Sequence, residues 1–116
     1  MEIRDKNIEI LEKIKNYCED ILEFATNSTH DEFINNKQIN YSICFPIAQI
    51  GELSNKLTKE FRNEHDHIEW TGIIAVRNRI IHGYGSVKMD FVWEVMIKDD
   101  IPQLKVDIEK ILKEYK

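Results

Sequence analysis

Residues 37–61 read KQINYSICFPIAQIGELSNKLTKEF, and their apolar side chains recur every three or four positions. That period places them on one face of an α-helix, so the segment predicts a long helix with one buried stripe. Pro46 lies inside it, where a proline removes one backbone donor and crowds the preceding turn. Because the stripe keeps its phase on both sides, we expect a kink there and no break. The stripe consists of Ile39, Ile43, Ile47, Ile50, Ser54, Leu57 and Phe61.

Two further helices are predicted upstream of this segment. Residues 4–25 carry one apolar stripe at helical spacing, and the polar run at 26–29 ends them. Thr29 is a suitable N-cap, because its hydroxyl can accept a hydrogen bond from the first turn of a short helix over residues 30–35. The stripe of the first helix consists of Leu11, Ile14, Cys18, Ile21 and Ala25.

Downstream, the polar residues 62–69 predict a loop, and residues 70–81 predict another helix. Gly83 and Gly85 should end that helix, because glycine accepts the backbone conformation that commonly follows a C-terminus.

A last helical stretch is predicted over residues 91–115, with Asp90 as its N-cap. Pro102 should bend or divide it near residues 99–100. No segment alternates between apolar and polar residues over six positions, as a half-buried strand does. The fold class is therefore predicted to be all-α, an antiparallel helical bundle.

The composition describes one ordinary globular domain over residues 1–116, with 42% apolar and 32% charged residues. A chain this short leaves much surface exposed, so dimerisation would supplement its core. No cationic leader and no apolar run of about 20 residues is visible, so we expect a cytoplasmic protein without membrane attachment. Cys18 and Cys44 lie among apolar residues and are expected to be free thiols in the core.

The charge is unevenly distributed along the chain. The formal net charge is −5, but residues 71–89 contain three cations and no acid, so the rest of the chain carries −8. These cations are Arg77, Arg79 and Lys88. A cationic patch on an acidic body can contact a few phosphates without coating a polymer, and the acidic remainder suits a basic protein partner.

Residues 77–84, RNRIIHGY, combine three chemically different polar groups near one helix end. Arg77 offers a planar cation that grips phosphate, and His82 titrates near neutrality. Asn78 adds an uncharged donor and acceptor. Arg77 and His82 lie about 140° apart around the helix and roughly 7.5 Å apart along its axis, so they can converge on one ligand without stacking. The negative helix end should raise the pKa of His82.

A purely structural role for these residues is the alternative. Arg77 could pair with an acid on another helix, and His82 could cap its own helix. Other candidates are weaker. The run Glu64-His65-Asp66-His67 lacks a cysteine or third histidine, so no metal is expected there. Three aromatic residues that could stack on bases are expected in the core instead, and the Asp99-Asp100 pair is expected to mark a helix terminus in solvent. The aromatic residues are Trp70, Phe91 and Trp93.

The order Arg, four residues, His, one residue, Tyr resembles the motif of the HepT-like HEPN proteins, the toxin components of HEPN/nucleotidyltransferase toxin–antitoxin pairs. The likeness extends over nearly the whole chain. It includes Phe33, Ile50-Gly51-Glu52, Ile68-Glu69-Trp70, Val92-Trp93-Glu94 and Asp99-Asp100-Ile101-Pro102. Asn78 departs from many relatives, which carry an acid at that position.

The resemblance implies a two-fold homodimer that cleaves RNA (mRNA or tRNA) without a metal or cofactor, by attack of a ribose 2′-hydroxyl. Arg77 would hold the phosphate with help from Asn78, and His82 would act as general acid or base. Tyr84 matches the tyrosine that a cognate nucleotidyltransferase antitoxin adenylylates. The other two cations of the segment are expected to contact RNA phosphates; they are Arg79 and Lys88.

A second hypothesis comes from another class of protein: a non-catalytic helical subunit that binds a nucleotidyltransferase or its substrate. The intact Arg–His–Tyr set favours the nuclease, because a scaffold does not require all three residues.

Overall fold

The computed structural model of the chain describes residues 3–82 and 88–115, with side chains for residues 5–80 and 88–115. Every regular element within these ranges is helical, which confirms the predicted all-α class. The elements are α1 (Ile3–Thr26), α2 (His30–Asn35), α3 (Lys37–Lys56), α4 (Lys59–Glu64), α5 (Trp70–His82), α6 (Met89–Phe91), the π-helix η2 (Val92–Asp100) and α7 (Ile101–Glu114).

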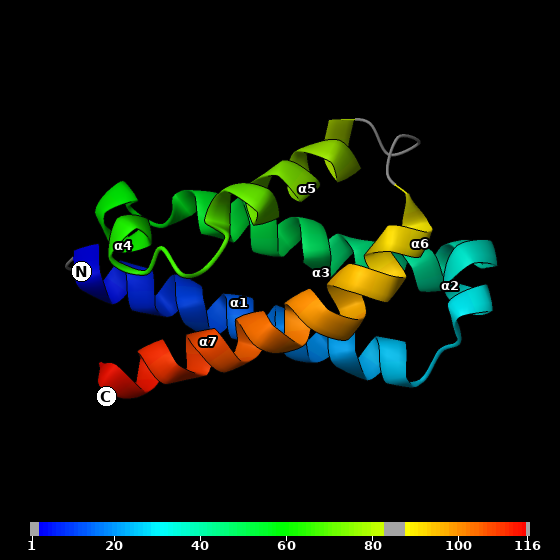
Figure 1. Cartoon of the computed structure of the whole chain (residues 1–116), viewed down its shortest axis with the longest axis horizontal. Coiled ribbons are helices and arrows are strands. Elements are labelled where there is room, and N and C mark those ends of the chain that lie inside the picture. The colour runs from blue at the N-terminus through cyan, green and yellow to red at the C-terminus, as the bar shows by residue number, and fades with distance from the viewer. Residues whose placement is uncertain (1–2, 83–87, 116) are drawn as a thin grey trace.

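Helix α3 is the centre of the bundle. It packs against α1 and against α5, while α7 lies along α1 (Figure 1). The predicted stripes supply the core, because Leu11 and Ile14 of α1 and Ile43 and Ile50 of α3 are buried. Helix α3 continues through Pro46. This confirms that the proline does not end the helix.

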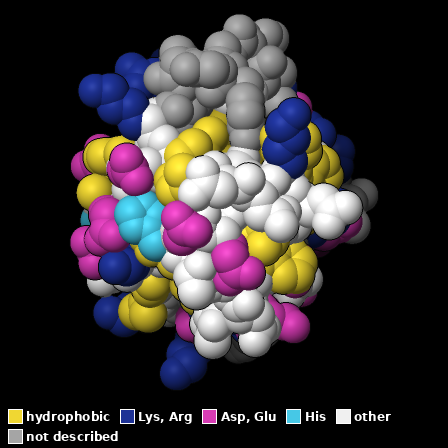
Figure 2. All heavy atoms as spheres, turned by 90° about the vertical axis from the view of Figure 1, so that its right-hand side faces the viewer, with side chains coloured by type: hydrophobic (Ala, Val, Ile, Leu, Met, Phe, Trp, Pro, Cys, Tyr) yellow, Lys and Arg dark blue, Asp and Glu magenta, His cyan; other side chains and the backbone are white. Residues whose placement is uncertain are grey.

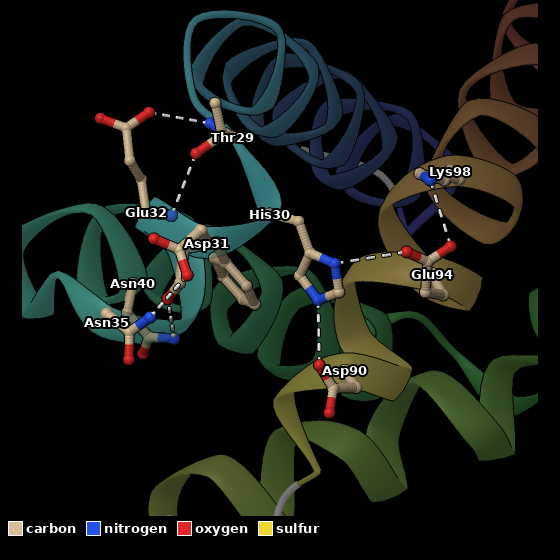
Figure 3. Close-up of polar contacts among 10 residues, drawn as sticks. Thr29, His30, Asp31, Glu32, Asn35, Asn40, Asp90, Glu94 and Lys98 are labelled. Carbon is tan, nitrogen blue, oxygen red and sulfur yellow. Dashed lines mark hydrogen bonds and ion pairs between the residues drawn. The ribbon is translucent and has the colours of Figure 1, made fainter.

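The short helix α2 begins where the sequence predicts. The Thr29 hydroxyl accepts a hydrogen bond from the backbone N–H of Glu32 at 3.1 Å, and the Glu32 carboxylate accepts one from the N–H of Thr29 at 2.9 Å (Figure 3). This reciprocal pair is a capping box, and it satisfies two backbone donors that a helix start leaves open.

The prediction of one helix over residues 37–61 is wrong. Helix α3 ends at Lys56, Leu57 is extended with ψ at 145°, and Thr58 caps the separate helix α4. The buried Asn7 holds this break from α1: its side-chain oxygen accepts from the Thr58 N–H at 3.2 Å, and its amide donates to the Thr58 hydroxyl at 3.1 Å. The predicted loop at residues 62–69 is therefore shorter, because α4 extends to Glu64.

The predicted cap at Asp90 is also wrong, because α6 begins at Met89 and Asp90 lies inside its first turn. The Asp90 carboxylate instead lies 2.9 Å from Nε2 of His30 on α2 (Figure 3). His30 also lies 3.5 Å from Glu94 and stacks on Trp93 with ring centroids 5.6 Å apart. These contacts join α2 to α6 and η2. Figure 2 shows acidic side chains on both sides of a histidine on this end of the molecule.

The C-terminal stretch changes its winding where the proline predicts. The Ile101 N–H donates to the carbonyl of Met96, five residues earlier, which is the π-helical pattern. Helix α7 then starts with Pro102 in its first turn, a position at which a missing N–H costs little. The winding thus changes next to residues 99–100, where a bend or division is predicted, but the backbone stays helical through Asp100 and Ile101 and the stretch is not broken. Asp99 and Asp100 are exposed there, as expected.

Both cysteines are free and buried, as predicted, and burial raises the pKa of the Cys18 and Cys44 thiols to about 12. Trp70 and Trp93 belong to the core, but Phe91 is 52% exposed, so its predicted burial is wrong. In the described part of the chain, no helix combines the length and apolar character that crossing a bilayer requires.

Candidate functional site

Arg77 lies on α5 and is held at both ends of its side chain. Its Nη2 lies 2.8 Å from Oε2 of Glu52 on α3, and its Nη1 donates to Oδ1 of Asn78 at 2.9 Å. The Arg77 stem lies over Gly51, where a methyl group would have no room: a Cβ on that glycine would overlap the Arg77 Cβ and lie 3.0 Å from its Cγ. Helices α3 and α5 can approach this closely only because residue 51 has no side chain.

The Arg77–Glu52 ion pair is only partly shielded from water. The two side chains are 27% and 36% exposed. An ion pair at such a surface contributes about 0–1 kcal/mol to the free energy of unfolding, so this pair adds little to the stability of the fold. A guanidinium has five N–H donors, and the two contacts leave others for a ligand. The structure thus shows the pairing given above as the alternative, in which Arg77 contacts an acid on another helix. This pairing is compatible with phosphate binding.

The other predicted site residues are placed only in part. Helix α5 is described from Trp70 to His82, one residue beyond the predicted range. The His82 side chain, the whole of Tyr84 and the glycines predicted to end the helix, Gly83 and Gly85, lie outside the described residues. Asn78 is exposed and contacts Arg77. Arg79 is exposed about 200° around the helix from Arg77, so the two cations do not share a face. Lys88 is exposed immediately before α6, which begins at Met89.

An apolar groove of about 340 Å³ lies beside the motif helix. Ile73 and Val76 of α5 form part of its wall, and the exposed Phe91 lies at its side. Asp100 at its margin is exposed as a residue, but partial desolvation of its carboxyl and the neighbouring Asp99 raise the pKa of that carboxyl. The remaining walls come from α3, η2 and α7, and acids lie around the groove. Further lining residues are Ile50, Glu69, Met96, Leu104 and Asp107.

The histidines whose side chains are described do not form part of a metal-binding group. Over residues 5–80 and 88–115, no three His, Cys, Asp or Glu side chains are grouped so that they could hold an ion. In the run at residues 64–67, His65 is buried against Phe61, with ring centroids 4.6 Å apart, whereas His67 is exposed. The two rings nevertheless lie edge to face, with centroids 6.2 Å apart. Among the described residues, no third His, Cys, Asp or Glu side chain joins them in a group that could hold an ion.

Glu52 and Gly51 are the residues at this site to which sequence reasoning assigned no role. They lie 25 and 26 positions before Arg77 in the chain, so no local spacing connects them with it. The available signal was a glycine in the middle of an otherwise regular apolar helix. Such a glycine costs stability unless another backbone or side chain must approach closely.

The fold and the site define a small all-helical bundle protein, with an arginine presented from one helix. Comparison with known proteins specifies the family. Residues 14–111 match the model of the ribonuclease HepT-like family. A protein of Methanocaldococcus jannaschii named a putative RNase is 38% identical over 101 residues, which cover 87% of this chain and 83% of that protein. A protein of Thermococcus cleftensis named a probable ribonuclease HepT is 31% identical over 103 residues, which cover 89% of this chain and 93% of that protein. No solved structure matches.

The chain therefore belongs to the HepT-like ribonuclease family. Family membership was implied by the resemblance of residues 77–84 and is confirmed by a match that covers most of the chain.

The two described glycines give a matched test of the contact that places Arg77. Gly51→Ala should destabilise the protein by about 1–3 kcal/mol, because the new methyl group would overlap Arg77 and force α3 and α5 apart. Gly72→Ala on α5 should stabilise it by about 0.5–1 kcal/mol, because an added Cβ meets nothing within 4 Å and alanine favours helix. Denaturant unfolding of both variants provides the comparison. Equal effects at the two positions would contradict the close approach.

Proposed function

We propose that this protein is a metal-independent endoribonuclease toxin of a type VII-like toxin–antitoxin pair. The observation that carries the proposal is the arginine of a HepT-like ribonuclease family member held at the surface by two contacts, with donors left for a phosphate. Relatives named as RNases support the same activity. The proposed substrate is mRNA or tRNA.

In the proposed reaction, the ribose 2′-oxygen attacks the adjacent phosphorus and the bond to the 5′-oxygen breaks. Arg77 holds the non-bridging phosphate oxygens and offsets the charge that develops on them. His82 acts as general acid, delivering a proton to the departing 5′-oxygen, or as the base that removes the 2′-proton. Asn78 accepts a hydrogen bond from Arg77 and keeps the guanidinium in place. Arg79 and Lys88 add contacts to neighbouring phosphates.

We also propose that two copies form the working unit. Support comes from the apolar groove beside α5 and from Phe91, a large apolar side chain left half exposed at its side. A second copy over this groove would bury both and place its own α5 close to the first. The proposed arrangement has two copies of Arg77 and His82 facing one cleft.

A nucleotidyltransferase is the proposed regulator, and its target is Tyr84. An AMP group on that tyrosine would add a negatively charged phosphodiester two residues from His82. Such a group would occupy the cations that the RNA phosphate requires, so charge and occlusion account for the inhibition.

Removal of the arginine or the histidine should abolish cleavage without unfolding the protein. We expect Arg77→Ala and His82→Ala each to lower RNA cleavage in EDTA by at least about 100-fold, the usual scale for a lost general acid or charge clamp. Arg77→Lys should also largely fail, because a point charge cannot reproduce a bidentate grip. Cleavage of a defined RNA is the readout, with Arg62→Ala as an arginine control.

Two results would reject this mechanism. One is activity that EDTA removes and a divalent ion restores. The other is an Arg77→Ala variant that no longer folds, since that result would favour the structural role of the arginine and the non-catalytic subunit.

The proposed dimer should be measurable by light scattering. At micromolar concentration we expect twice the chain mass of 13.8 kDa. Phe91→Glu should shift the protein toward the monomer, because it places a charge against the apolar groove. Phe24→Glu on α1, a phenylalanine that is also exposed, serves as control and should leave the mass unchanged. A monomer over the whole concentration range would contradict the shared cleft.

The proposed modification predicts a change in intact mass. Co-expression with an active nucleotidyltransferase encoded beside this chain should add one or more AMP units of about 329 Da each at Tyr84. Tyr84→Phe should stay unmodified and remain toxic in the presence of that enzyme. Mass spectrometry of both proteins, made with and without the partner, checks the assignment. Modification of Tyr84→Phe, or silencing of the wild type without any mass change, would overturn it.

A further inference from the structure

The side chain of Arg77 is fixed by three features that come from two helices. Its stem lies against Gly51 of α3, and its guanidinium contacts Glu52 of α3 and Asn78 of α5. Gly51 and Glu52 are consecutive, so one step of α3 provides both the space for the stem and the anion for the head. None of the proposed catalytic roles uses Glu52.

The positions of the contacts on the guanidinium matter. Glu52 takes one N–H on Nη2 and Asn78 takes one on Nη1, so the two terminal nitrogens are restrained by different partners. A planar group held at two nitrogens cannot turn freely about its last bonds. The donors that remain are therefore presented in one orientation. An arginine ordered before the substrate arrives loses less conformational freedom on binding a phosphate than a free one does.

From this geometry we infer that Glu52 is a positioning residue, which orients Arg77 toward the scissile phosphate through the Nη2 contact. The inference rests on the proposed ribonuclease function and adds a residue to it. The contrary possibility is that the Glu52 carboxylate competes with RNA for Arg77 and so restrains the enzyme. The two possibilities predict opposite effects when the charge of residue 52 is removed.

Steady-state cleavage of a short RNA by Glu52→Ala and Glu52→Gln separates them. If Glu52 positions Arg77, Glu52→Ala lowers kcat by about 10- to 100-fold with little change in KM, as expected for a misaligned catalytic group. Glu52→Gln should recover most of the activity, because its amide oxygen can still accept from Nη2. Glu109→Ala is the matched control: Glu109 also pairs across two helices, 3.8 Å from Lys15, and is 41% exposed. That variant should cut RNA as the wild type does.

A lower KM in both Glu52 variants, with kcat kept or raised, would show competition and overturn the inference. Unchanged kcat in Glu52→Ala would overturn it as well. Arg77→Ala in the same assay separates this failure from a failure of the proposed function. If Arg77→Ala is inactive and Glu52→Ala is fully active, only the positioning role falls. If Arg77→Ala is also fully active, the proposed site is wrong.

NMR of the arginine side chains tests the positioning independently of cleavage. In the wild type, the Arg77 guanidinium should show restricted rotation and a resolved Nε–H signal. Glu52→Ala should lose both, while Glu52→Gln should retain them in part. Free rotation of the Arg77 guanidinium in the wild type would overturn the inference even if RNA is cut.

Discussion

The close approach of α3 and α5 at Gly51 is the constraint on which the candidate site depends. A side chain at residue 51 would overlap Arg77, so the absence of a Cβ there sets how near the two helices lie. That separation in turn brings Glu52 within 2.8 Å of the Arg77 guanidinium. Packing and charge thus act on one residue together: the helix contact fixes the arginine stem, and the carboxylate fixes its head. A small bundle can in this way present an ordered cation from a partly exposed surface.

The elements of the fold that could be predicted are those specified by neighbours in the sequence. The stripe of α1 and the Thr29 cap of α2 depend on residues three or four positions apart, and the structure has both where the pattern places them. The break after Lys56 could not be predicted, because it depends on Asn7, which contacts Thr58 from 51 positions away. Asp90 was misassigned for the same reason, since its partner His30 lies 60 positions away.

The residues of the candidate site likewise fall into those that could be predicted from the sequence and those that could not. Arg77 could be selected from its own segment, because arginine, asparagine and histidine near one helix end suggest phosphate chemistry whatever the fold. Glu52 could not be given a role from the sequence, because only the packing of α3 on α5 makes it a neighbour. The roles of His82 and Tyr84 rest on the family motif and on the proposed mechanism. Exposure was harder to foresee: Trp93 and Phe91 lie two positions apart, yet Trp93 is buried and Phe91 is half exposed.

The central claim is that RNA is cut by its own 2′-hydroxyl, with Arg77 and His82 supplying the charge and the proton. Analysis of the ends produced from a synthetic RNA in EDTA tests it most directly. This mechanism predicts a 2′,3′-cyclic phosphate on one fragment and a 5′-hydroxyl on the other, and no cleavage of the same RNA when every 2′-oxygen is methylated. Fragments with a 5′-phosphate and a 3′-hydroxyl, or equal cleavage of the methylated RNA, would contradict it.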